Sequence, residues 1–174
     1  MAGNQTMERT IAFTVYNESN VPLGLVTVDL PVLEAMSDTV SGAGIAGEVE
    51  SPVLGHYGSM TTTFTWRTIE PEAMELSTPV PHYVVLRSSQ QTYDSANGIY
   101  GSTPVRMSMC IVPKTVTLGT FATGASTETE QEFEVLYLKV YIDNREVLEI
   151  DKYNTVARFN GVDVLESVRA DLGM

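Results

Sequence analysis

The stretch FEVLYLKVYIDNREVLEIDKY, residues 133–153, carries the clearest structural signal in the sequence. Two strand-like runs, FEVLYLKVYI and VLEIDKY, flank the short segment DNRE. Asp143 and Asn144 in that segment favour a tight turn, because their side chains bond to nearby backbone and tolerate positive φ. The stretch therefore predicts an antiparallel β-hairpin.

A period of two continues outward from this hairpin. IAFTVYN and LGLVTVDLP, separated by the turn-prone NESNVP, predict a second hairpin. In MTTTFTWRTI an apolar face opposes a hydroxyl-rich one, with Met60, Thr62, Phe64 and Trp66 on the first and Thr61, Thr63, Thr65 and Arg67 on the second. YVVLRSSQQTY and TPVRMSMCIVP predict two more strands. In the last, Val105, Met107, Met109 and Ile111 form the inward row, so Cys110 faces the other way.

Helical patterns are confined to two short stretches, EPEAMELS and VDVLESVRADLG. The second has apolar residues at helical spacing, namely Val164, Leu165, Val168 and Leu172. At 174 residues and 43% hydrophobic, the chain is the size of one domain, and no linker or internal repeat divides it. We therefore expect a single domain over residues 1–174 that is mainly β.

The charge balance excludes some functions. Ten basic against 22 acidic residues give a net charge of −12, which argues against a protein that grips nucleic acid by neutralising phosphates. Up to Gly58 the only basic residue is Arg9. No signal peptide, lipid anchor or apolar run long enough to cross a bilayer is apparent, so we expect no membrane anchor.

The segment TVSGAGIAGEVESPVLGHYGSMT, residues 39–61, contains five glycines within 17 residues. Gly42, Gly44 and Gly47 match the G-x-G-x-x-G of a dinucleotide-binding loop. That fingerprint requires a strand directly before it and a helix beginning within it. The preceding strand-like run ends at Pro31, and no helix can follow Gly47 through EVESP. We therefore interpret the segment as a long glycine-rich loop that binds something else.

No catalytic or metal site emerges from the sequence. The sequence has two histidines and one cysteine. We interpret His56 as a loop residue, His82 as a residue at the start of a strand and Cys110 as a small strand residue. We expect no enzyme activity, no cofactor and no bound metal.

Acidic residues alternate through TETEQEFE, where Glu128, Glu130, Glu132 and Glu134 are expected on one strand face. Four like charges in a row repel one another, so the row must face water or a basic partner.

The order of these blocks resembles the major tail tube proteins of contractile-tailed phages and of phage-tail-like bacteriocins (tailocins). The resemblance runs through FTVYNESNVPLGLVTVDLPVL, the glycine segment with EVESPVLG, and TTTFTWRTI. It is most specific in YLKVYIDNREVLEIDKYNTVARFNGVDVLESVRADLGM, with its IDxxEVxEID hairpin, NGVD and a terminal R-x-x-LG.

The resemblance implies an antiparallel β-sandwich or open barrel with a small helix. It also implies hexameric rings that stack into the inner tube of a contractile tail, as conduit for the genome and puncturing rod. The implied partners are further copies of the chain, the tail sheath protein, the baseplate hub, the tape-measure protein and DNA that passes without specific binding. The implied location is a virion tail or tail-like particle, assembled in the host bacterial cytoplasm.

Three sets of residues acquire a role from the resemblance. The loop residues expected to reach a neighbouring ring are Gly42, Gly44, Ile45, Gly47 and Glu48. The residues expected to cover the sheet or a neighbouring subunit are Val164, Leu165, Val168 and Leu172. The acidic row Glu128, Glu130, Glu132 and Glu134 is expected to face the sheath, with the lumen as the alternative.

Two function classes remain beside this one. A type VI secretion ring protein shares the implied fold, and a monomeric β-rich binding module fits the strand pattern. A nucleotide enzyme is a distant third. Regular tubes in electron microscopy distinguish the assembling proteins from the monomeric module.

Overall fold

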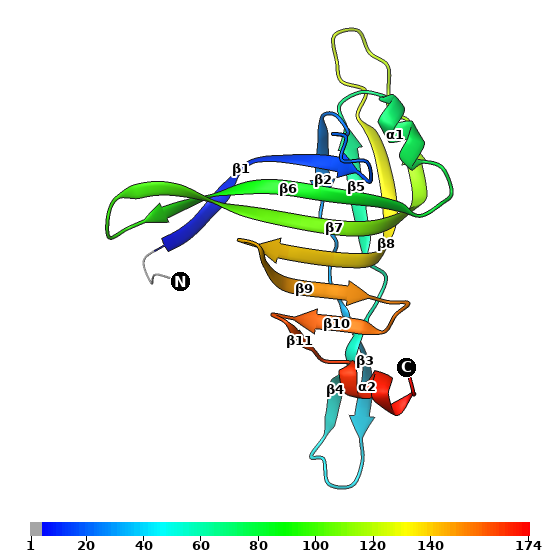
Figure 1. The fold of residues 1–174 in the computed structure, drawn as a ribbon. Helices are drawn as coiled ribbons and strands as arrows, with labels where there is room; N and C mark the ends of the chain where they lie inside the picture. Colours follow the sequence, from blue (N-terminus) through cyan, green and yellow to red (C-terminus); the bar gives the residue numbers. More distant parts are fainter. Residues whose placement is uncertain (1–4) are drawn as a thin grey trace.

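The computed structural model describes residues 5–174 as antiparallel β-sheet with two short helices (Figure 1). The strands are β1 (Gln5–Asn17), β2 (Val26–Asp29), β3 (Ala35–Ser41), β4 (Glu48–Tyr57), β5 (Thr61–Trp66), β6 (His82–Asp94), β7 (Ile99–Thr117), β8 (Thr129–Ile142), β9 (Arg145–Asp151), β10 (Val156–Phe159) and β11 (Val162–Asp163). The helices are α1 (Pro71–Leu76) and α2 (Glu166–Asp171). The expectation of a mainly β, antiparallel fold is confirmed.

Two layers of sheet share the long strand β8. The front layer follows the order β1-β6-β7-β8-β9-β10-β11, while β2 pairs with β5 and β5 pairs with β8. Residues 129–134 of β8 pair with β5, whereas residues 137–142 pair with β9. Figure 1 shows the result: β2 and β5 stand upright behind the strands β1, β6 and β7. We call β2, β5 and the parts of β8 and β7 beside them the back layer.

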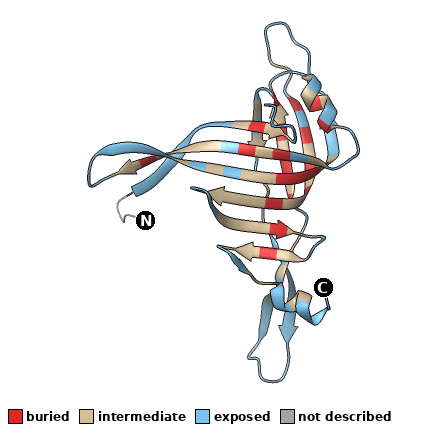
Figure 2. Cartoon of the chain, viewed as in Figure 1, coloured by how far each residue is buried: buried red, intermediate tan, exposed pale blue. Residues whose placement is uncertain are grey.

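The hydrophobic core lies between these layers, where Figure 2 shows most of the buried residues. Phe64 has edge-on ring contacts with Trp66 and Phe133, at centroid distances of 6.1 and 5.2 Å. Buried Gln131 fixes helix α1 above this cluster: it accepts a bond from Trp66 Nε1 at 2.7 Å and donates to the Ala73 carbonyl at 2.7 Å. Because a buried amide without partners is costly, this bond pattern holds the helix in one place.

The hairpin predicted over residues 133–153 is confirmed. Strands β8 and β9 pair directly, and the turn residues Asp143 and Asn144 have φ of 49° and 59°. Positive φ at both central residues is the backbone of a type I′ turn, which matches the twist of the flanking strands.

The hairpin predicted for IAFTVYN and LGLVTVDLP is wrong. β1 pairs with β6 in the front layer and β2 pairs with β5 in the back layer, and β1 contacts the connecting segment through the bridge between Tyr16 and Pro22. Residues 18–25 therefore carry the chain from the front layer to the back layer. Asn20, with φ of 60°, and Gly24, with φ of 88°, supply the unusual backbone angles.

The long glycine-rich loop expected for residues 39–61 is a projecting hairpin, in which residues 42–47 form the glycine turn at the tip. β3 and β4 form a separate two-stranded sheet, which projects from the body at the bottom of Figure 1. We call residues 35–57 the arm. All seven residues of β3 are exposed, so backbone pairing rather than a buried face holds the arm together.

The C-terminal helix is shorter than the sequence pattern predicts. α2 begins only at Glu166, after Leu165 at its N-cap, and covers six residues. Neither α2 nor any other helix within residues 5–174 has the length and apolar character needed to span a membrane.

Candidate assembly surfaces

The tip of the arm is a turn whose backbone angles are low in energy only for glycine. Gly44 and Gly47 have φ of 101° and 121°, in a region that L-residues rarely occupy. A Cβ at Gly42, Gly44 or Gly47 would meet no atom within 4 Å, so the glycines serve backbone shape and not close packing within the subunit. Strand β4, and not a helix, follows Gly47, which contradicts a dinucleotide-binding loop.

The arm carries apolar and acidic groups that its own subunit leaves uncovered. Val40 and Val49 face each other across the hairpin with exposed fractions of 45% and 52%, and Ile45 at the tip is also exposed. Glu48 begins β4 beside them and is exposed. Exposed apolar side chains grouped on a projection are typical of an interaction surface.

The base of the arm packs against the C-terminal segment. Gly55 in β4 has φ of 64°, and a Cβ there would lie 2.6 Å from Leu165 Cγ. Tyr57 contacts Phe159 with ring centroids 6.4 Å apart. The two regions that the sequence singled out separately therefore meet.

Only part of the predicted C-terminal packing is found within the subunit. Leu165 is buried, Val164 and Val168 are half-buried, and Leu172 is 66% exposed. Leu172 was expected to cover the sheet or a neighbouring subunit, and within its own subunit it stays exposed at the C-terminal cap of α2. A contact of Leu172 with a neighbouring subunit stays a prediction.

The acidic row contains three residues rather than four. Glu130, Glu132 and Glu134 alternate along β8, but Glu128 precedes the strand with φ of 54° and lies outside the row. Lys114 bonds Glu132 at 2.9 Å and lies 3.9 Å from Glu134. The repulsion expected from the sequence is therefore reduced at Glu132 and Glu134, because Lys114 in β7 and Lys152 just after β9 supply counter-charges.

Glu134 is the most firmly held member of the row. Ser59 donates to one of its carboxylate oxygens at 2.5 Å, and Lys152 lies 3.4 Å from the other. Burial opposes its charged form, but these bonds outweigh burial and hold the pKa of Glu134 below its usual value. Glu134 therefore stays ionised at neutral pH.

These acids belong to a wider polar face on the back layer. Thr61, Thr63 and Thr65 stand directly opposite Glu134, Glu132 and Glu130. Adjoining strands add Thr27 and Asp29 from β2 and Thr115 and Thr117 from β7. We call these ten residues the acid–hydroxyl face. The sequence predicted its threonine and glutamate parts separately, and the pairing of β5 with β8 joins them.

The front layer also carries a network of ion pairs that the sequence pattern does not predict. Lys139 bonds Glu146 at 2.9 Å and Glu149 at 3.2 Å, and Arg169 bonds Asp163 at 2.8 Å. The Arg169 guanidinium holds the pKa of Asp163 below its usual value. These charges come from strands β8 to β11 and helix α2, so only strand register could reveal them. The network ties the C-terminal segment to the sheet.

The histidines and the cysteine show no arrangement for catalysis. His56 is exposed on the arm and its Nδ1 lies 2.8 Å from the Leu54 carbonyl, while His82 begins β6 and contacts Thr78. Cys110 is buried on the side of the sheet away from Met109, and burial raises the pKa of its thiol. A thiol held protonated is a poor nucleophile. Within residues 5–174, no three potential His, Cys, Asp or Glu ligands converge on one point.

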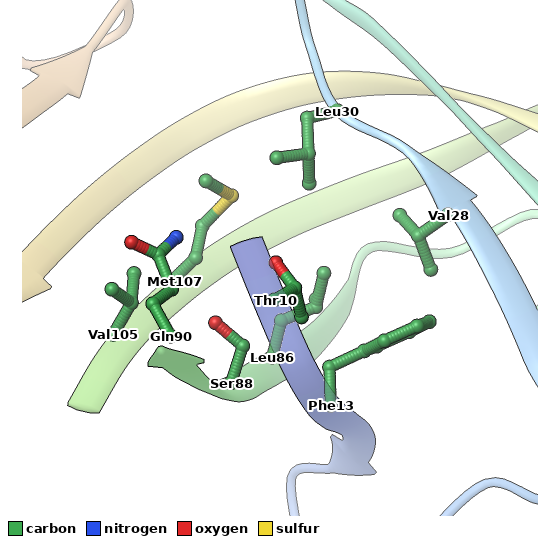
Figure 3. Close-up of a pocket in the computed structure, with 9 residues that line it drawn as sticks. All are labelled: Thr10, Phe13, Val28, Leu30, Leu86, Ser88, Gln90, Val105 and Met107. Carbon is green, nitrogen blue, oxygen red and sulfur yellow. The ribbon is translucent and has the colours of Figure 1, made fainter. Parts of the chain in front are cut away.

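An apolar hollow of about 260 Å³ lies beneath β1, β6 and β7, where β2 stops short of covering the front layer (Figure 3). Val28 and Leu30 overhang it from the β2 side, and Phe13, Leu86 and Met107 line it from the front layer. Its polar groups are the neutral side chains of Thr10, Ser88 and Gln90. The hollow is core surface without an opposing layer, and it lacks a charged group to orient a substrate.

Residues 5–174 thus form a β-rich subunit with a projecting arm and a polar face on its back layer. A family model described as phage tail tube protein FII matches residues 8–173. The chain belongs to this phage tail tube family and has the structural role of a tail component. No curated protein matches the sequence.

Proposed function

We propose that this chain forms hexameric rings that stack into the inner tube of a contractile phage tail or tail-like bacteriocin. The family match supports the tail tube role, and the resemblance to contractile-tail proteins supports the hexamer and the sheath. The observation that carries the proposal is the back layer, which has one polar face and two free edges.

The free edges are complementary in direction. β2 pairs only with β5, and residues 112–117 of β7 pair only with β8 because β6 begins opposite Ile111. The four strands alternate in direction across the layer, so rotation about an axis places β2 of one copy antiparallel to β7 of the next. Pro113 and the irregularity before Thr115 leave residues 115–117 as the best segment for backbone bonds. Such pairing closes a barrel and removes both edges.

A barrel of this kind makes the acid–hydroxyl face its lining. The front layer is the larger of the two and belongs at the larger radius, which turns the opposite face of the back layer inward. Carboxylates and threonine hydroxyls repel or only weakly bind phosphates, so DNA can slide past them. This arrangement favours the lumen over the sheath for Glu130, Glu132 and Glu134.

The remaining partners follow from a tube inside a sheath. The outside of the tube meets the sheath protein, its ends meet the baseplate hub, and the tape-measure protein occupies the lumen before DNA passes. Sheath contraction drives the tube into the target envelope, and the tube itself carries out no reaction. A neighbour attached at β2 also covers the hollow of Figure 3, since Val28 in β2 and Leu30 just after it line the hollow.

Cysteine pairs test ring closure. The variant Thr27→Cys, Thr117→Cys places one thiol on each free edge, and Cys110 is only 6% exposed. Oxidation of assembled protein is expected to give covalent oligomers up to six subunits that do not form in the single variants. A purified chain that stays a monomer at high concentration, with no tubes in negative stain, contradicts the proposal.

A second variant tests the lining. Changing Glu130, Glu132 and Glu134 to Gln is expected to leave tubes intact but make them retain DNA or other polyanions, more strongly at low salt. Loss of sheath attachment with an unchanged lumen would instead assign the row to the outer surface.

A further inference from the structure

Loop 118–128 projects from the end of the molecule opposite the arm. Figure 1 shows it beside α1 at the top, between β7 and β8, while the arm points away at the bottom. Phe121 on this loop is 85% exposed, the highest fraction of any large hydrophobic side chain within residues 5–174. Large apolar side chains that are exposed to this degree often mark a surface that another molecule covers.

The loop is anchored at its base, so Phe121 is presented on an ordered support. Thr120 donates to the Thr127 carbonyl at 3.0 Å, and Thr127 donates to the Arg67 carbonyl at 2.9 Å. Gly119 has φ of 82°, and a Cβ there would lie 2.0 Å from the Thr127 carbonyl oxygen. The two chain segments at the base therefore approach as closely as a glycine permits.

Arg67 supplies a positive charge at the base of this loop, where its carbonyl accepts a bond from Thr127. Residues 118–127 carry no charge, and the adjacent Arg67 is exposed and makes no ion pair with any carboxylate of residues 5–174. Arg9, Arg87, Arg106 and Arg145 also make no ion pair with a carboxylate of residues 5–174, so Arg67 is distinguished by its place at the base of this loop and not by being unpaired. Arg67 also lines a shallow groove with Leu25, Ser126 and the acidic residue Glu128.

The arm has the complementary chemistry. Its tip combines apolar Val40, Ile45 and Val49 with the exposed carboxylate of Glu48. Glu50 is already engaged, because it accepts a bond from Ser37 at 2.6 Å. The tip therefore offers one free carboxylate beside an apolar patch, and the opposite end offers one guanidinium at the base of the loop that carries Phe121.

We propose that loop 118–128 and Arg67 of one copy form the docking site for the arm tip of another copy. Phe121 packs on the apolar tip, and Arg67 pairs with Glu48. The contact joins opposite ends of the subunit, so it repeats without closing and generates a stack. This inference rests on the proposed function and names the receiving surface of its axial contact.

Crosslinking tests which surfaces meet. In the variant Ile45→Cys, Phe121→Cys, each copy has one thiol at each end, and oxidation of assembled tubes is expected to give a ladder of covalent multimers. The matched control is Ile45→Cys, Tyr153→Cys, since Tyr153 is 78% exposed at a different place, and it is expected to give no ladder. Both variants should melt like the unmodified protein, because these side chains have few contacts to lose.

Charge reversal tests the ion pair. Arg67→Glu and Glu48→Arg are each expected to raise the subunit concentration required for tube formation by roughly tenfold, and the combined variant is expected to restore it. If the unmodified chain forms tubes but the reversals have no effect and the cysteine pair gives no ladder, the docking site is wrong while the tube function stands. If the unmodified chain forms no tubes at all, both are wrong.

Discussion

Gly55→Ala is expected to loosen the junction between the arm and the C-terminal segment. Gly55 has φ of 64°, and its missing Cβ would lie 2.6, 2.8 and 2.9 Å from the three outer carbons of Leu165. Leu165 is 2% exposed and cannot swing into solvent. The left-handed backbone costs about 1–2 kcal/mol for an L-residue, and overpacking costs about 1–3 kcal/mol. Together they predict a loss of about 2–5 kcal/mol in the free energy of unfolding.

Denaturant unfolding measures this loss, and Gly98→Ala is the matched control. Gly98 has φ of 68°, but a Cβ there would meet nothing within 4 Å, so only the backbone cost applies. Adding Leu165→Ala to Gly55→Ala should make the combined loss smaller than the sum of the two single losses, because the clash is removed. Equal losses for Gly55→Ala and Gly98→Ala would refute the contact with Leu165.

Three further predictions address other parts of the structure. Gly44→Val is expected to leave a folded subunit but shorten or abolish tubes, because a β-branched residue resists φ of 101°; tubes of normal length would show that the tip is not an assembly element. Leu165→Ala should lower the free energy of unfolding by about 2–5 kcal/mol, whereas Leu172→Ala, at a 66% exposed position, should change it by less than about 0.5 kcal/mol, as denaturant titration can show. Asp163 and Glu134 have folded-state pKa values below their usual ones, so their stabilisation is present above about pH 4 and is lost as pH falls through the folded pKa; a melting temperature that does not fall in acid would contradict this.

Patterns with a buried face were predictable from the sequence. Met60 and, in β5, Thr62, Phe64 and Trp66 are buried as their alternation predicts, because burial of one face enforces the period of two. The turn at Asp143 and Asn144 was predictable because local side-chain chemistry specifies it. Features of this kind depend on neighbours in the sequence.

Features that depend on strand partners were not predictable. β1 and β2 look like a hairpin in the sequence, but β1 pairs with β6 and β2 pairs with β5, which are both distant in the sequence. The arm was missed because both its faces are exposed and leave no alternation to detect. The ion pair between Lys114 and Glu132 depends on the register of β7 with β8, which the sequence pattern does not reveal. The repulsion predicted for the acidic row was therefore too large.

Electron cryomicroscopy of the purified chain tests the central claim most directly. Our account predicts hollow tubes of stacked rings in which Thr63, Glu130 and Glu132 line the lumen and β2 of each copy lies antiparallel to β7 of its neighbour. Tubes lined by the opposite side of the molecule, with Arg87 and Tyr141 facing the lumen, would contradict the assignment of the conduit face.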